Sequence, residues 1–212
     1  MKSKYFSEFL GTAFLFCTVV GSGIMGQNLS SNDSLTLLAN TLATVFALYF
    51  LITVFGDHSS HFNPVVSMVM LVRKEITTQV CTVFIILQIS GAILGVMLAN
   101  YIFELDPVYF SEKPRSGNHL FVSEILATFG LLMVILLSSK EKVAVTVAAY
   151  IGAAYWFTSS TSFANPAGTI GRSFSNTFAG ISTNDILHFC VAQIIGAFLA
   201  LFVYKTFFES QK

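Results

Sequence analysis

The chain has 212 residues, of which 54% are hydrophobic and only 10% are charged. A water-soluble domain of this size could not cover so much apolar area with polar surface, so the composition indicates an integral membrane protein. Eleven basic residues balance eleven acidic ones without a basic arm or an acidic tail, which argues against nucleic acid as a partner.

Six apolar segments are long enough to cross a bilayer. They cover residues 5–25, 35–55, 76–103, 120–137, 143–160 and 186–208. The first follows Lys2 and Lys4, as the apolar region of a secretory signal peptide would. Its length of about twenty residues favours an uncleaved spanning helix instead. Six spans would place both termini on one side of the membrane.

Two shorter apolar segments, each headed by Asn-Pro, lie between spans two and three and between spans five and six. The first begins at Asn63-Pro64 and the second at Asn165-Pro166. Asparagine caps free N–H groups at a helix start, and proline at the first helical position loses no needed hydrogen bond. About ten helical residues cover about 15 Å, or half of the hydrocarbon thickness. The sequence therefore predicts two re-entrant half-helices.

The order of motifs is repeated in the two halves of the chain. The pairs are Glu8 to Thr12 with Glu124 to Thr128, Asn63-Pro64 with Asn165-Pro166, and Gln88 to Ala92 with Gln193 to Ala197. Three spans per repeat is an odd number, so the second copy inserts upside down relative to the first. The prediction is a single membrane domain over residues 1–212, with inverted repeats 1–106 and 117–212 joined by an extracellular connector.

The basic residues indicate the orientation. Only two lie in loops opposite the termini, Lys113 and Arg115, while Arg172 falls inside the second re-entrant segment. Eight lie on the side of the termini, namely Lys2, Lys4, Arg73, Lys74, Lys140, Lys142, Lys205 and Lys212. Positive charge concentrates in cytoplasmic loops, so both termini are expected to be cytoplasmic.

In an inverted repeat, the two half-helices enter from opposite faces and meet by their N-termini near the midplane. Helix dipoles then place partial positive charge in the middle of a pathway, where cations and protons are repelled. The amide groups of Asn63 and Asn165 could donate to a passing water or hydroxyl group. This pattern favours conduction of neutral molecules.

These motifs resemble the aquaporin, or major intrinsic protein, family. The resemblance rests on His61-Phe-Asn-Pro-Val-Val66, on Phe163-Ala-Asn-Pro-Ala167, on the paired glutamates and on the two Gln-x-x-Gly-Ala sequences. It implies an all-α bundle of six tilted helices and two half-helices in a cell membrane. It also implies homotetramers and passive flow of water and small neutral solutes through each subunit.

The resemblance assigns roles to individual residues. Asn63 and Asn165 would be the pore donors, and His61 would line the cytoplasmic vestibule. Glu8 and Glu124 would hold the re-entrant loops by accepting from unpaired backbone N–H groups, since a carboxylate within a membrane is costly. An alternative for Glu8 is that it reaches to water at the cytoplasmic edge.

The chain departs from the family where the second Asn-Pro-Ala sequence is normally followed by arginine. Gly168 stands at that position, and Arg172 lies one helical turn further on. Two interpretations are open. The guanidinium of Arg172 leans back toward the vacant place, or it binds loop carbonyls or an acidic residue and leaves the pore wide.

The other constriction positions implied by the family hold small residues: Ala43 or Thr44, Ala153 and Ser162. They predict a wide, weakly polar pore mouth. Val65 replaces an alanine after Asn63-Pro64, whereas Pro166-Ala167 is kept. Val65 would either narrow the midplane or pack outward.

Residues 154–180 resemble a branch of the family associated with arsenical resistance in microbes. This resemblance favours neutral hydroxylated solutes such as glycerol, arsenous acid or boric acid, alongside water. An alternative function is a proton-coupled secondary transporter, in which Glu8 and Glu124 would carry protons. No Ser-His or paired-aspartate arrangement indicates an enzyme, and no cofactor or metal is expected.

Overall fold

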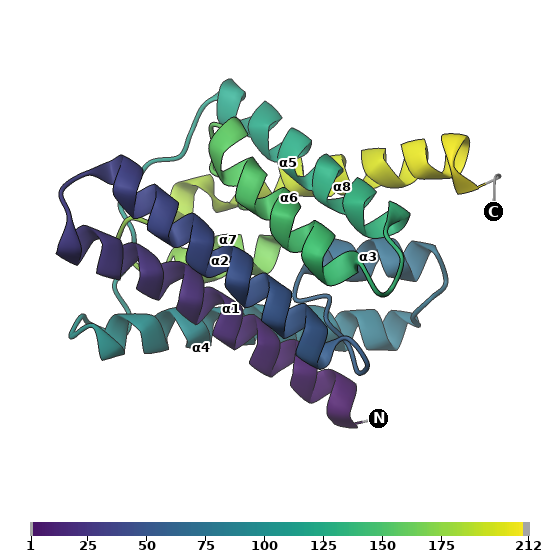
Figure 1. Ribbon diagram of the computed structural model, residues 1–212, viewed down its shortest axis with the longest axis horizontal. Coiled ribbons are helices and arrows are strands. Elements are labelled where there is room, and N and C mark those ends of the chain that lie inside the picture. The colour runs from purple at the N-terminus through teal and green to yellow at the C-terminus, as the bar shows by residue number, and fades with distance from the viewer. Residues whose placement is uncertain (1, 210–212) are drawn as a thin grey trace.

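The computed structural model describes residues 2–209 and is helical throughout, with no strand among these residues (Figure 1). The spanning helices are α1 (Lys2–Leu29), α2 (Asp33–Phe55), α4 (Thr78–Ile102), α5 (Asn118–Leu137), α6 (Val143–Phe157) and α8 (Ile186–Phe207). The half-helices are α3 (Pro64–Val72) and α7 (Pro166–Arg172), and a short 3-10 turn covers Thr183–Asp185. Lys212, counted above for the orientation, lies outside the described residues.

Five of the helices between residues 2 and 209 are long and apolar enough to cross a membrane, and α6 is a shorter apolar helix. The fifth predicted span, residues 143–160, extended too far at its C-terminal end. The backbone of Thr158 turns to an extended conformation at φ −106° and ψ 134°, so α6 stops at Phe157 after 15 residues. Such a helix is about 23 Å long, and the irregular loop that follows, with left-handed residues at Thr161, Ser162 and Ala164, leads to the second Asn-Pro step.

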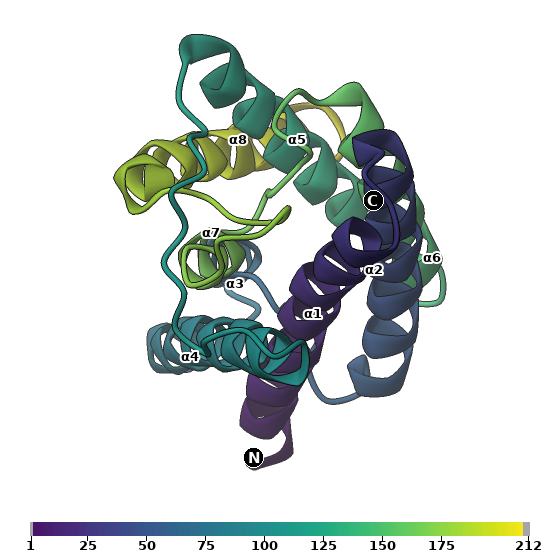
Figure 2. The same cartoon turned by 90° about the vertical axis from the view of Figure 1, so that its left-hand side faces the viewer.

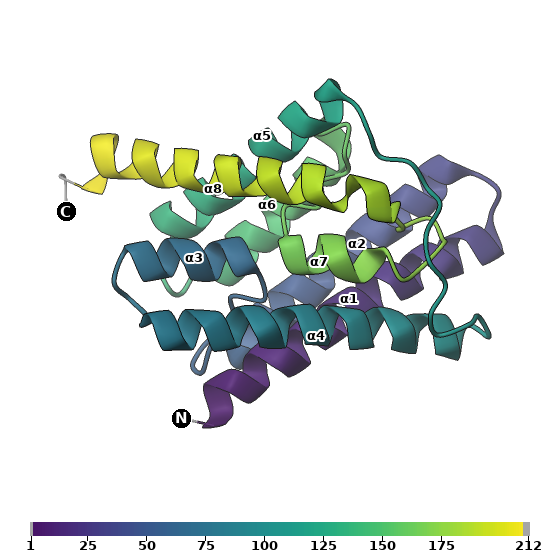
Figure 3. The ribbon, with the colours of Figure 1, turned by 180° about the vertical axis from the view of Figure 1, so that it is seen from behind.

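The two Asn-Pro steps begin helices by the expected mechanism. The side chain of Asn63 accepts from the backbone N–H of Val65, and the side chain of Asn165 accepts from those of Ala167 and Gly168. The half-helices lie nearly end to end in the middle of the bundle (Figure 3). The second has only seven residues, fewer than the roughly ten predicted from hydropathy.

Glycines let pairs of long helices approach closely. Side chains at Gly91 or Gly95 of α4 would overlap backbone atoms of α1, and a side chain at Gly196 of α8 would overlap the carbonyl group of Ile125 on α5. The Gly-Ala sequences of the repeat therefore mark the same contact in each half, α1 with α4 and α5 with α8. Figure 2 shows these two pairs on either side of the half-helices.

The connector between α4 and α5 lies across the segment that follows α7 (Figure 2). The N–H of Tyr109 donates to the carbonyl oxygen of Phe174 at 3.1 Å, and that of Ser111 donates to Ser173 at 2.8 Å. The connector is therefore held against the loop that leaves the second half-helix.

Candidate functional site

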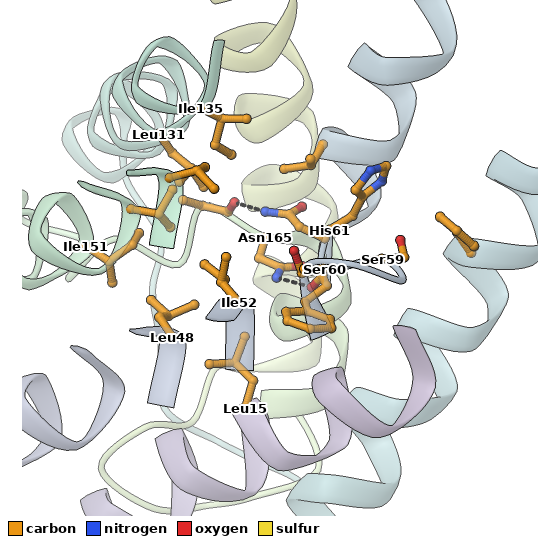
Figure 4. Close-up of a pocket in the computed structure, with 18 of the residues that line it drawn as sticks. Leu15, Leu48, Ile52, Ser59, Ser60, His61, Leu131, Ile135, Ile151 and Asn165 are labelled. Carbon is orange, nitrogen blue, oxygen red and sulfur yellow. Dashed lines mark hydrogen bonds between the residues drawn. The ribbon is translucent and has the colours of Figure 1, made fainter. Parts of the chain in front are cut away.

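A cavity of about 500 Å³ runs along the half-helices and loops. Its lining includes Lys4, Lys140, Tyr155 and Arg172. Figure 4 shows leucine and isoleucine side chains of the spanning helices on one side and loop residues, including His61 and Asn165, on the other. The cavity thus has one apolar wall and one polar edge, as a path for a small polar molecule requires.

Glu8 is completely buried and binds the loop that enters the first half-helix. Its carboxylate accepts from the backbone N–H groups of His61 and Phe62, both at 2.8 Å, and from the hydroxyl of Ser59. The side-chain amide of Gln88 donates to it at 2.7 Å. This carboxylate therefore does not reach to water, as the alternative for Glu8 required.

Glu124 makes the corresponding contacts in the second half. It accepts from the N–H groups of Phe163 and Ala164 at 3.0 and 2.9 Å, and from the amide of Gln193 at 2.6 Å. Both loops contain left-handed residues, with φ of 49° at Phe62 and 47° at Ala164. The carboxylates satisfy N–H groups at these bends, where the backbone makes no helical bonds.

Asn63 and Asn165 both line the cavity. The amide nitrogen of Asn63 donates to the carbonyl oxygen of Ala164, and that of Asn165 donates to Phe62, each at 2.8 Å. One N–H of each amide joins the two loops, and the second has no hydrogen-bond partner among residues 2–209. His61 also lines the cavity, with its Nδ1 at 3.0 Å from the hydroxyl of Ser67.

The structure combines parts of the two interpretations of Arg172. It lines the cavity, and its Nε donates to the carbonyl oxygen of Ala179. Its guanidinium carbon lies 3.3 Å from the ring centroid of Phe163. Among residues 2–209 no acidic side chain forms a salt bridge with it. The arginine therefore binds a loop carbonyl and still faces the cavity.

The remaining residues of the Asn-Pro motifs do not line the cavity. Val65 is completely buried in the hydrophobic core, which answers the question of its packing: it points away from the path. The other motif residues outside the lining are Pro64, Pro166, Ala167 and Gly168. They begin and pack the half-helices.

Of the expected constriction positions on α2 and α6, Thr44 lines the cavity, whereas its alternative Ala43 and the α6 residue Ala153 do not. Ala153 is exposed on the outside of α6, and Ala43 is outside the cavity lining. Thr44 and Tyr155 line it instead, with their hydroxyl oxygens 3.1 Å apart. The error on α6 is one of register, because Tyr155 lies two residues, or about 200°, further round the helix. Sequence spacing contained the signal: Val143, Val147, Ile151 and Tyr155, four residues apart, all line the cavity.

Ser162 lines the cavity and has a left-handed conformation with φ of 50°. Its hydroxyl oxygen is buried and has no hydrogen-bond partner within residues 2–209. A buried hydroxyl is normally paired, so the unpaired hydroxyl of Ser162 is an exception among the described residues. Phe16, which the sequence analysis missed, also lines the cavity and lies against Gly168.

Arg115 of the connector was expected only to be an extracellular loop cation, but it is buried behind the cavity wall. Its Nε donates to the carbonyl oxygen of Gly180 at 2.8 Å, and its guanidinium carbon lies 4.8 Å from the ring centroid of Phe163. Its backbone N–H donates to Asp185 at 2.7 Å. Burial lowers the pKa of Arg115 to about 10, so it remains charged at neutral pH. Charge counting alone could not reveal this contact.

These groups can bind and orient a solute through hydrogen bonds. Hydroxyl, amide and guanidinium groups follow one another along an apolar wall. Among the described residues, no group of three or more His, Cys, Asp or Glu side chains could hold a metal ion.

Comparison with known proteins agrees with this geometry. The chain is 46% identical over 199 residues to aquaglyceroporin AqpS of Rhizobium meliloti (strain 1021), covering 92% of this chain and 85% of that protein. It is 32% identical over 218 residues to glycerol uptake facilitator protein-like 6 of Lactiplantibacillus plantarum, covering 94% and 95% of the two chains.

The fold has a solved counterpart. The crystal structure of the aquaglyceroporin from Plasmodium falciparum matches with a TM-score of 0.75 at 19% identity, covering 99% of this chain and 98% of the other. The family model for major intrinsic protein matches residues 1–204. The paired half-helices, the cavity beside them and these similarities lead to one conclusion: the chain belongs to the major intrinsic protein family of passive membrane channels for water and small solutes.

Proposed function

We propose that this channel conducts neutral hydroxylated solutes of the glycerol, arsenous acid and boric acid class together with water. The proposal rests on the positions of Gly168 and Arg172 relative to the cavity. Gly168 leaves the family's arginine position without a side chain, and Arg172 faces the cavity one turn further along α7. A charged donor therefore remains in the path but is displaced from its usual place.

The polar groups near Arg172 suit a solute with several hydroxyl groups. Ser162 presents an unpaired hydroxyl, and Thr44 and Tyr155 present a bonded pair that can accept or donate further. Leu48, Ile52 and other apolar residues line the opposite side. Transfer of the carbon atoms of a polyol from water to this wall costs little free energy. A site of this kind binds hydroxyl groups and is not selective for one particular hydroxylated solute.

Charge selection would come from the half-helix N-termini. Both asparagine caps line the cavity, so the positive ends of two helix dipoles meet there. Cations and protons are repelled at such a position, whereas neutral molecules accept hydrogen bonds from the free amide N–H groups. The cavity would thus conduct small neutral solutes and exclude ions.

The alternative of a proton-coupled transporter finds less support. Glu8 and Glu124 would have to bind and release protons during each cycle. Each carboxylate instead accepts at least three hydrogen bonds from loop or glutamine donors, and these buried donors would lose their partner if the carboxylate moved during a transport cycle. We assign both glutamates to supporting the re-entrant loops.

The wider setting follows from the family and from the sequence. We propose a homotetramer in the inner or plasma membrane with both termini cytoplasmic. Repeats 1–106 and 117–212 would then insert in opposite directions, and the connector that holds Arg115 would be extracellular. Cysteine labelling of single-cysteine variants in intact cells and in inside-out vesicles tests this orientation.

Stopped-flow light scattering on proteoliposomes tests the solute class directly. We expect water, glycerol and boric acid to pass, without saturation at millimolar concentrations and without movement of protons. Arsenous acid is expected to enter at a comparable rate, as measured by uptake. Water flux with no flux of any of these solutes would contradict the proposal, and solute-driven proton movement would favour the transporter.

Arg172→Ala tests the displaced filter. We expect the ratio of glycerol to water permeability to rise about threefold, equivalent to about 0.7 kcal/mol in barrier height. Arg73→Ala is the matched control, because Arg73 caps the other half-helix but does not line the cavity. An unchanged ratio in a folded Arg172→Ala protein would remove Arg172 from the filter.

A further inference from the structure

Gly168 and Phe16 fit together as a small and a large residue on neighbouring helices. A methyl group placed on the Cα of Gly168 would overlap the Cζ and Cε1 atoms of the Phe16 ring. The ring therefore occupies the space from which any side chain at position 168 would grow. An aromatic residue of α1 fills the volume that α7 leaves empty.

Phe16 also belongs to the cavity wall. Its ring is buried except for 5% of the residue's surface, and it lines the cavity with Leu15 and Val19 of the same helix. Thr44, Tyr155 and Arg172 line the same cavity from three other helices. At the level where the family places a charged side chain, this chain therefore presents a phenyl ring.

A phenyl ring and a guanidinium group restrict a path in different ways. The ring is rigid and bulky and donates no conventional hydrogen bond, so it limits width without binding a hydroxyl group. A guanidinium group in the same place would do both. Separating the two roles leaves Arg172 as the donor and a different residue as the size limit.

We propose that Phe16 is a specificity-determining residue whose ring sets the maximum width of solute that the channel admits. This inference rests on the proposed function, because it concerns the same path. It assigns the size limit to α1 rather than to the second Asn-Pro loop. The Phe16 ring fills the space that the missing side chain of Gly168 leaves, so substitutions at the two positions are expected to have coupled effects.

The first test measures a series of polyols in proteoliposomes. Phe16→Ala is expected to raise the ratio of erythritol to glycerol permeability about fivefold, equivalent to about 1 kcal/mol in barrier height. Phe14→Ala is the matched control, since Phe14 lies on the same helix and is 52% exposed on its outer face. A folded Phe16→Ala protein with the wild-type ratio would overturn the proposal.

Loss of the ring also leaves a void, so folding is measured by size-exclusion chromatography and thermal unfolding. Should Phe16→Ala fail to assemble, Phe16→Leu retains most of the apolar volume while shortening the side chain. It is expected to raise the same ratio by a smaller factor. An unchanged ratio in Phe16→Leu would then overturn the proposal.

The second test uses the fit between the two residues. Gly168→Arg alone is expected to reduce the folded yield, because the new side chain meets the Phe16 ring. The double variant Phe16→Ala with Gly168→Arg is expected to recover the yield and to pass less glycerol than Phe16→Ala. Independent effects of the two substitutions would contradict the coupling.

The outcomes separate this inference from the proposed function. If the wild type passes water but no glycerol, the proposed solute class fails. The size limit is then tested by the appearance of glycerol flux in Phe16→Ala. If the wild type passes glycerol and Phe16→Ala leaves the polyol series unchanged, only the role of Phe16 fails.

Discussion

Asn63 and Asn165 are each hydrogen bonded to the loop that carries the other. The amide of Asn63 donates to Ala164, the residue before Asn165, and the amide of Asn165 donates to Phe62, the residue before Asn63. Each side-chain oxygen meanwhile caps its own half-helix. The starts of the two half-helices are therefore fixed to one another as well as to their own loops.

This reciprocal contact predicts that Asn165→Asp destabilises the fold. A carboxylate cannot donate, so an oxygen would face the carbonyl oxygen of Phe62 where the amide now lies at 2.8 Å. We expect a loss of roughly 2 kcal/mol in the free energy of unfolding, the usual cost of a broken buried hydrogen bond. Thermal unfolding in detergent measures it. Asn28→Asp, at an exposed position, should leave the unfolding temperature unchanged.

Glu124→Gln is expected to destabilise the second re-entrant loop. An amide has one acceptor oxygen, so its NH₂ group would face an N–H of Phe163 or Ala164, or the amide of Gln193. The expected cost is again about 2 kcal/mol, with a lower solute flux per channel. Glu112→Gln, an exposed position on the connector, serves as the control in the same unfolding assay. Wild-type stability in Glu124→Gln would mean that the carboxylate does not hold the loop.

Arg115→Ala tests whether the connector positions the cavity wall. The substitution removes the bond to Gly180 and the guanidinium beside Phe163, which itself contacts Arg172. We expect a lower unfolding temperature together with a higher glycerol-to-water permeability ratio, since Phe163 and Arg172 lose a support. Arg115→Lys keeps the charge but loses the multiple donors and should restore the ratio only in part. A change in stability without a change in the ratio would limit Arg115 to a structural role.

Lys113 of the connector makes stability depend on pH. Burial, followed by the charges of Arg115 and Arg172, lowers the pKa of Lys113 from 10.5 to about 8. Between these values the unfolded chain binds more protons than the folded one, so the free energy of unfolding rises as pH increases through this window. Lys113→Met should remove this part of the rise in unfolding temperature between pH 8 and 10.5. Lys142→Met, at an exposed site, should keep it. Identical pH profiles for wild type and Lys113→Met would contradict the assignment.

Much of the fold was predictable because local rules decide it. Apolar length predicted the spanning helices, and the Asn-Pro steps predicted the half-helix starts at Pro64 and Pro166, where caps need only neighbouring residues. The paired glutamates and glutamines were recognisable as candidate functional residues, because burying a charged side chain within a membrane is energetically costly. The end of α6 was missed, since nothing in the apolar sequence 143–160 marks the point where Thr158 becomes extended.

The lining of the cavity was less predictable, and the reason is geometric. Two residues along a helix differ in direction by about 200°. The sequence therefore pointed to Ala153, which is exposed, although Tyr155 lines the cavity. Phe16 and Arg115 reach the site from segments far from either Asn-Pro step. Local spacing contains no information about such contacts.

The sequence by itself determined the membrane class, the two half-helices, the family and the absence of an arginine at position 168, because each depends on composition or on adjacent residues. Only the tertiary structure decided which side chains face the path. It brought the ring of Phe16 against Gly168 and Arg115 beside Phe163, because packing between distant helices fills space according to shape, and shape is set by all the helices together.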